Sequence, residues 1–126
     1  MATWRDLSLE CRQAAQNSLR DNCLRSSINR SYYSAYAALS GKLEGKVIYR
    51  EGRNNPAHAD LPTYILHNLD ALSRGVRYDL TKALGRLWKA RVLADYIPLA
   101  FVDRGLAVNA LRDMNTILLA LEYENE

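Results

Sequence analysis

The sequence has few of the residues that build metal sites, disulfide scaffolds or membrane spans. It contains only two cysteines, two histidines and three prolines in 126 residues, and no HExxH or CxxC pattern occurs. No apolar run approaches the ~18 residues that a bilayer span needs. The first six residues also lack the apolar core of an export signal. We therefore expect a cytoplasmic protein with no metal, no other cofactor and no membrane association.

Long alternating segments, which would indicate a sheet, are missing as well. Apolar residues recur instead at spacings of three and four, which predicts an all-α, up-and-down bundle of about five helices. At this length the residues 1–126 form a single domain. The helices are expected over residues 3–22, 26–43, 60–75, 78–96 and 103–121, with N-caps at Ser26 or Ser27, Asp60 and Asp103 and a stop at Gly75.

Two of these helices carry a feature that the structure can test directly. Cys11 and Cys23 are twelve residues apart, and one unbroken helix through both would separate them by about 18 Å and prevent a bridge. They are expected to be reduced, buried, small apolar residues. The last helix has a clean seven-residue apolar repeat from Ala107 to Leu121, which could either pack in the core or pair across a dimer.

The charge balance is mildly basic and rests on arginine. The formal net charge is +3, and thirteen arginines stand against four lysines. A guanidinium binds phosphate bidentately, but it serves equally in internal ion pairs. This composition permits an RNA partner without requiring one.

Three local patterns could carry chemistry. The first is Arg53 followed by His58 in a polar loop, a pair suited to metal-free RNA cleavage: the imidazole moves a proton and the arginine stabilises the phosphate. The plainer interpretation is a histidine at a helix start beside a solvated arginine. No nucleophile elbow or glycine-rich phosphate loop competes with this pattern.

The second pattern is a helical run with Arg30 followed by Tyr32, Tyr33 and Tyr36. Such rings could stack on a nucleobase while the arginine takes its phosphate, although tyrosines at this spacing are more often core residues. The third is Arg91, which interrupts the apolar stripe of the fourth helix four residues before Asp95. A guanidinium there needs a partner, so the pair is either a structural ion pair or part of a ligand pocket.

The second and third patterns together resemble the HEPN family (higher eukaryotes and prokaryotes nucleotide-binding). The likeness is to the branch of the family with Arg-x-Tyr-Tyr and Arg-x-x-Ala-Asp-Tyr motifs. The matching segments are RSSINRSYYSAYA at residues 25–37 and RVLADY at residues 91–96. His58 resembles the histidine that often opens the third helix in that branch. The resemblance implies a homodimeric helical bundle. Many relatives are metal-independent ribonucleases of bacterial toxin–antitoxin or defence systems, and others bind nucleotides or act as scaffolds.

The resemblance also assigns candidate residues. It implies a nucleotide- or RNA-binding pocket formed by Arg30, Tyr33, Asp95 and Tyr96 together with Arg91, with His58 at its rim. In a ribonuclease, Arg91 or Arg53 would stabilise the phosphate and His58 would move the proton. Ala37 stands where the branch usually has a histidine, and none follows Arg91, which points to a weak nuclease or a non-catalytic binder.

Two other hypotheses remain open at the level of sequence. One is a non-catalytic interaction module whose last-helix repeat docks on an antitoxin or effector protein. The other is an unrelated four-helix scaffold, which would require Arg30 and Arg91 to lie far apart in space.

Overall fold

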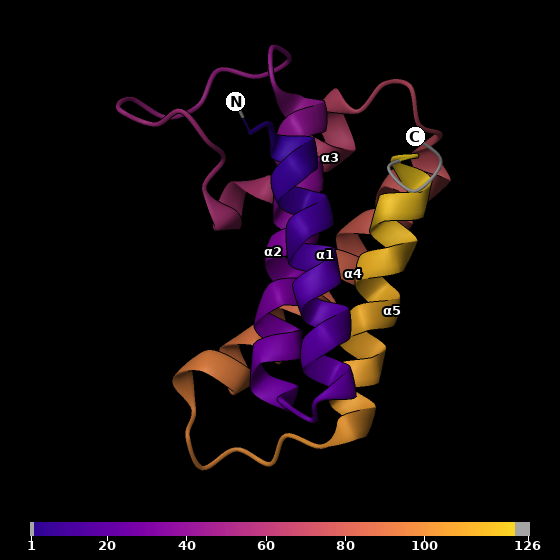
Figure 1. Cartoon of the computed structure of the whole chain (residues 1–126). Helices are drawn as coiled ribbons and strands as arrows, with labels where there is room; N and C mark the ends of the chain where they lie inside the picture. Colours follow the sequence, from indigo (N-terminus) through magenta and orange to yellow (C-terminus); the bar gives the residue numbers. More distant parts are fainter. Residues whose placement is uncertain (1, 123–126) are drawn as a thin grey trace.

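The structure, a computed structural model, describes residues 2–122 as an assembly of helices. They are α1 (Trp4–Arg20), α2 (Leu24–Leu43), α3 (Leu61–Asn68), α4 (Arg74–Tyr96) and α5 (Arg104–Ala120), with a single 3₁₀ turn, His58–Asp60, before α3. Figure 1 shows α1, α2, α4 and α5 running alternately up and down, with the short α3 near one end. The described residues contain no strand, so the predicted all-α class is confirmed.

Helix α2 is the centre of the bundle, because it packs against α1, α4 and α5. Small side chains let α1 approach it closely: the Ser34 hydroxyl donates to the carbonyl of Ser8 at 2.7 Å, and the Ser8 hydroxyl donates to that of Ser34 at 2.8 Å. Both serines are fully buried. A buried hydroxyl without a partner would be costly, so these reciprocal bonds also fix the register of the two helices.

The apolar stripes predicted on the last two long helices form the other half of the core. On α4 every stripe residue is buried, including the arginine that interrupts the stripe. On α5 the repeat residues Ala107, Met114, Leu118 and Leu121 are all at most 4% exposed, and Leu111 is half-buried. Most of the repeat therefore faces the core of its own chain, and a partner that docked through it could reach little more than Leu111.

Helix starts were predicted with mixed success. Thr3 and Asp6 form a capping box at α1, and the Asp103 carboxylate accepts from the Leu106 amide at 2.8 Å. The cap predicted at Ser26 or Ser27 is wrong, because α2 already begins at Leu24 and the Ser27 hydroxyl donates to the Ala15 carbonyl of α1 instead.

Asp60 also does not cap the third helix. Its carboxylate accepts two hydrogen bonds from the Arg50 guanidinium, at 2.7 and 2.9 Å, and no side-chain cap is formed. That hydrogen bonding lowers the pKa of the Asp60 carboxyl. The aspartate thus holds the preceding loop rather than the helix end.

The predicted stop at Gly75 is wrong as well. Helix α3 ends at Asn68, and Gly75 lies in the first turn of α4, where the Ser73 hydroxyl accepts from the Val76 amide at 3.2 Å. Helix α4 therefore begins four residues earlier than expected. A serine cap satisfies an amide at this end and offsets the low helix propensity of the glycine.

The two cysteines do not share a helix. Helix α1 ends at Arg20, Asn22 adopts a positive φ of 61°, and Cys23 immediately precedes α2. Cys11 is half-buried and Cys23 is exposed, so the prediction of two buried thiols is wrong. Both are free thiols, and burial raises the pKa of Cys11.

One arginine holds the connection between α4 and α5. The guanidinium of Arg25, at the start of α2, donates five hydrogen bonds of 2.9–3.2 Å to the backbone carbonyls of Leu93, Ala94, Ile97, Pro98 and Ala100. Carbonyls at a helix C-terminus lack intrahelical partners, and a cation is favourable there. The bonds give the connection a defined backbone, although its side chains Leu99 and Phe101 are 99% and 85% exposed.

Within residues 2–122, no helix is both long enough and apolar enough to cross a membrane.

Candidate functional site

Arg91 is the most deeply buried charge in the described part of the chain. Its side chain is only 8% exposed, and its Nε donates to a carboxylate oxygen of Asp95 at 3.2 Å, one turn later on α4. Its Nη2 donates to the hydroxyls of Tyr33, at 2.9 Å, and Tyr96, at 3.0 Å. These bonds compensate for the loss of water around the charge.

Aromatic rings complete the surroundings of this guanidinium. Its central carbon lies 5.0–5.3 Å from the ring centroids of Tyr32, Tyr33, Trp88 and Tyr96. A cation near the face of such rings is attracted by their quadrupoles, by ~0.5–2 kcal/mol for each contact. Asp95 also accepts from the Asn29 amide at 2.7 Å, so the same group of contacts ties α4 to α2.

The predicted pocket residues are brought together. The Arg30 guanidinium carbon lies 5.3 Å from the Tyr33 ring centroid, and the Arg91 guanidinium carbon lies 5.0 Å from the same point. Arg30 also donates to Asn29, on its own helix, and to the sulfur of Cys11 on α1. Arg30 and Arg91 are therefore close in space, whereas an unrelated scaffold would require them to lie far apart.

His58 joins this cluster from the loop side. Its Nδ1 lies 2.5 Å from the Tyr32 hydroxyl, and its ring centroid is 4.7 Å from that of Tyr36 and 5.4 Å from that of Trp88. Burial, and then the positive charges of Arg91 and Arg53, lower the pKa of His58 below its ordinary value of 6.5. The imidazole is therefore neutral at pH 7.

Arg53 lies at the edge of the cluster rather than in it. It is exposed, and its guanidinium donates to the backbone and side-chain oxygens of Asn55 at 3.2 and 2.8 Å. It makes no hydrogen bond to His58, although its charge is close enough to lower the pKa of that residue. Of the two arginines predicted to stabilise a phosphate, Arg53 is the one on the surface.

A pocket of about 390 Å³ opens beside His58. Its walls come from the 3₁₀ turn, α3, α2 and α4, and they are Tyr32, His58, Ala59, Pro62, Leu84, Gly85 and Trp88. Arg91 does not line the pocket, but its guanidinium lies against the rings of two residues that do, Tyr32 and Trp88. Burial raises the pKa of the Tyr32 hydroxyl, which therefore stays protonated.

Of the seven wall residues, only Tyr32 and His58 were identified from the sequence; Trp88 and Gly85 are the most consequential of the other five. Trp88 is 38% exposed, and it lies one turn before Arg91 on α4. A tryptophan beside an apolar stripe was the available signal. Gly85 carried no signal, and only the structure shows that a β-carbon there would meet no atom within 4 Å.

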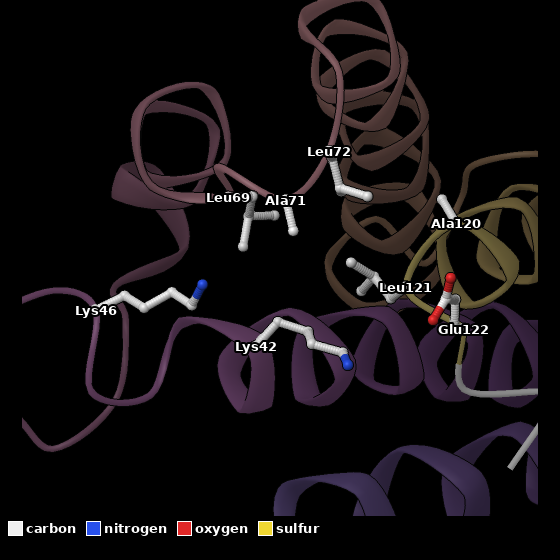
Figure 2. Close-up of a pocket in the computed structure, with 8 residues that line it drawn as sticks. All are labelled: Lys42, Lys46, Leu69, Ala71, Leu72, Ala120, Leu121 and Glu122. Carbon is white, nitrogen blue, oxygen red and sulfur yellow. The ribbon is translucent and has the colours of Figure 1, made fainter.

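A second cavity lies at the C-terminal end of α2, and Figure 2 shows its walls. Lys42 and Lys46 border one side, while Leu69, Leu72 and Leu121 supply an apolar side. It measures about 160 Å³, less than half the volume of the aromatic pocket, and contains no residue of the predicted site.

Another pocket, of about 400 Å³, is lined by the predicted residues Arg30 and Asp95. Of the predicted site residues, only His58 lines the aromatic pocket. We assign the candidate site to the aromatic pocket because His58 borders it and because the Arg91 guanidinium lies against two of its rings.

Within residues 2–122, no three His, Cys, Asp or Glu side chains lie close enough together to bind a metal ion. Comparison with protein-family models and with curated proteins yields no match to this chain.

Replacing Arg91 should test whether its enclosure stabilises the fold. We expect Arg91→Ala to lower the free energy of unfolding by about 3 kcal/mol, because the aromatic cage and two tyrosine hydroxyls lose their cation. Arg86→Ala is a matched control on the same helix, since Arg86 pairs with Asp113 but is 60% exposed, and it should cost less than about 1 kcal/mol. Urea unfolding measures both, and equal losses would contradict a stabilising cage.

The lowered pKa of His58 predicts a pH dependence of stability. His58 has a lower pKa in the folded protein than in the unfolded chain, so the unfolded chain takes up the proton more readily. The contribution of His58 to the free energy of unfolding is therefore fully present above pH 6.5 and falls as the pH drops towards the folded-state pKa. We expect His58→Gln to flatten this fall in urea unfolding at successive pH values. His67→Gln, which retains His58, should keep the slope; the reverse result would show that the burial of His58 is not its cause.

Proposed function

We propose that this chain is a HEPN-like protein that binds a nucleotide or RNA, with a base held in the aromatic pocket. The supporting observation is the pocket itself, which is lined by the rings of Tyr32, Trp88 and His58. The buried Arg91 guanidinium packs against two of these rings, those of Tyr32 and Trp88. A volume of about 390 Å³ lies within the usual range for small-molecule sites. Base–aromatic stacking contributes ~1–3 kcal/mol for each base.

The arrangement also supports a metal-independent cleavage step. In the tautomer with its proton on Nδ1, His58 donates to the Tyr32 oxygen, and its Nε2 lone pair would accept the proton of a ribose 2′-hydroxyl. The 2′-oxygen would then bond to the phosphorus, the bond from phosphorus to the 5′-oxygen would break, and water would protonate the leaving 5′-oxygen. The exposed Arg53 would stabilise the phosphate charge, whereas Arg91 is committed to Asp95 and the tyrosines. Arg91 then acts as a positioning residue for the rings.

The resemblance of the two motifs to the HEPN family also suggests in which kind of cellular system the protein would act. A protein of this kind would belong to a bacterial toxin–antitoxin or defence system and would work as a homodimer. The hydrogen-bonded cluster of Tyr33, Arg91, Asp95 and Tyr96 supports the resemblance, because it joins the two motif segments, from α2 and α4.

A non-catalytic interaction module is the second candidate. The observation that favours it is the connection after α4, where Leu99 and Phe101 are almost fully exposed while Arg25 holds the backbone beneath them. Preorganised apolar side chains of this kind are suited to anchoring a protein partner. In this alternative the partner, an antitoxin or effector, binds the connection and not the α5 repeat.

Filling the pocket from Gly85 tests the proposal without removing any contact. We expect Gly85→Leu to weaken binding of AMP at least about tenfold, because the new side chain occupies the pocket, while the helix itself gains up to ~1 kcal/mol from losing a glycine. Gly75→Leu is the control, since Gly75 lies on the same helix with equally open surroundings but outside the pocket. Isothermal titration with AMP and with ribose 5-phosphate measures the effect, and equal binding of the two would show that no base is recognised.

Incubation with RNA in EDTA separates the two candidates. A ribonuclease should cleave without metal and lose cleavage in His58→Gln while keeping it in His67→Gln, because only His58 borders the pocket. Product analysis on a gel with an excess of protein gives the readout. Intact RNA at every protein concentration, or cleavage that survives in His58→Gln, would rule out the catalytic role of His58.

A further inference from the structure

The outward face of α4 carries a basic stripe that the pocket does not explain. Its members are Arg74, Tyr78, Lys82, Gly85 and Lys89, spaced three or four residues apart and all exposed. Residues at this spacing share one face of a helix. At 1.5 Å per residue the stripe runs for about 22 Å.

The charges of the stripe have no carboxylate partner in the part of the chain that the structure describes. Arg74, Lys82 and Lys89 form no ion pair with any carboxylate among residues 2–122, whereas Arg86 on the same helix binds Asp113. Lys82 instead places its Nζ 4.6 Å from the ring centroid of Tyr78. The stripe is therefore a row of free cations with an aromatic ring between them.

The stripe also passes the mouth of the aromatic pocket. Gly85 belongs to both, and Trp88, one turn further along α4, lines the pocket and remains 38% exposed. A ligand whose base entered the pocket would have the rest of its chain beside this row of cations.

We infer that the stripe binds the sugar–phosphate backbone of a single-stranded RNA whose base occupies the pocket, an inference that rests on the proposed function. Cations with interleaved aromatic rings suit a polyanion with exposed bases. The stripe offers no large aliphatic side chain on which an amphipathic helix could pack. A single strand fits better than a duplex, because a base can enter the pocket only when it is unstacked.

The test compares salt dependence in two triple variants. Each phosphate contact on a single strand contributes about −0.7 to the slope of log Kobs against log salt concentration, so the variant Arg74→Gln, Lys82→Gln, Lys89→Gln should flatten the slope by about 2. The variant Arg20→Gln, Lys46→Gln, Arg112→Gln removes the same charge from exposed positions off the stripe and should change the slope much less. The probe is a fluorescent 12-nucleotide oligoadenylate, measured by anisotropy.

The outcomes distinguish the inference from the proposed function. Adenosine, which has no phosphate, should bind equally to wild type and to both variants, since none of the replaced residues lines the pocket. AMP binding combined with an unchanged slope in the stripe variant would overturn the inference and leave the proposed function standing. A flattened slope without any AMP binding would support the stripe and overturn the base pocket.

Two further results would also overturn the inference. Equal flattening by both variants would show that only net charge matters. Competition by polyglutamate as effective as competition by unlabelled RNA would indicate an acidic protein as the partner of the stripe.

Discussion

The burial of one guanidinium organises this molecule. The Arg91 side chain is almost completely buried, so its charge needs hydrogen-bond partners within the protein. Those partners come from both α2 and α4. The rings that surround it cannot move without exposing or unpairing the cation. Because Tyr32 and Trp88 are two of those rings, the cage of Arg91 also fixes two walls of the aromatic pocket. Stability and the shape of the candidate site thus depend on the same contact.

Arginine serves the interior of this protein more than its net charge would indicate. Arg25 donates to backbone carbonyls at the end of α4, and Arg91 donates to tyrosine hydroxyls and a carboxylate. Arg50 binds the loop residue Asp60 at the surface. A planar fork with several donors suits such sites better than a lysine ammonium. The excess of arginine over lysine is therefore explained in part by structure, and it does not by itself indicate RNA. The unpaired cations of the α4 stripe, two of them lysines, are stronger evidence for a polyanionic ligand.

Periodicity and capping chemistry predicted much of the fold. The stripe of α4 and the repeat of α5 are core residues, and the cap at Asp103 forms as expected, because these features depend on spacing within one helix. Errors arose where a tertiary contact competed with a local preference. Ser27 donates to Ala15 across two helices, and Asp60 is held by Arg50, so neither caps a helix.

The site was predictable only in part for the same reason. The spacing of Arg91 and Asp95 on one helix is visible in the sequence, and the need of Arg91 for a partner follows from the apolar stripe around it. The approach of His58 to Tyr32 joins residues that are 26 positions apart through an irregular loop, and no local pattern encodes that path. The open space above Gly85 likewise depends on how α3 and the 3₁₀ turn lie against α4.

The most direct test of the central claim is an NMR titration of the protein with AMP, followed through the Trp88 indole, the His58 imidazole and the Gly85 amide. A base stacked in the aromatic pocket predicts saturable, coincident shifts of these three signals, with little change at Lys46 or Leu121 in the cavity at the C-terminal end of α2. Shifts confined to that second cavity, or none at saturating AMP, would contradict the account.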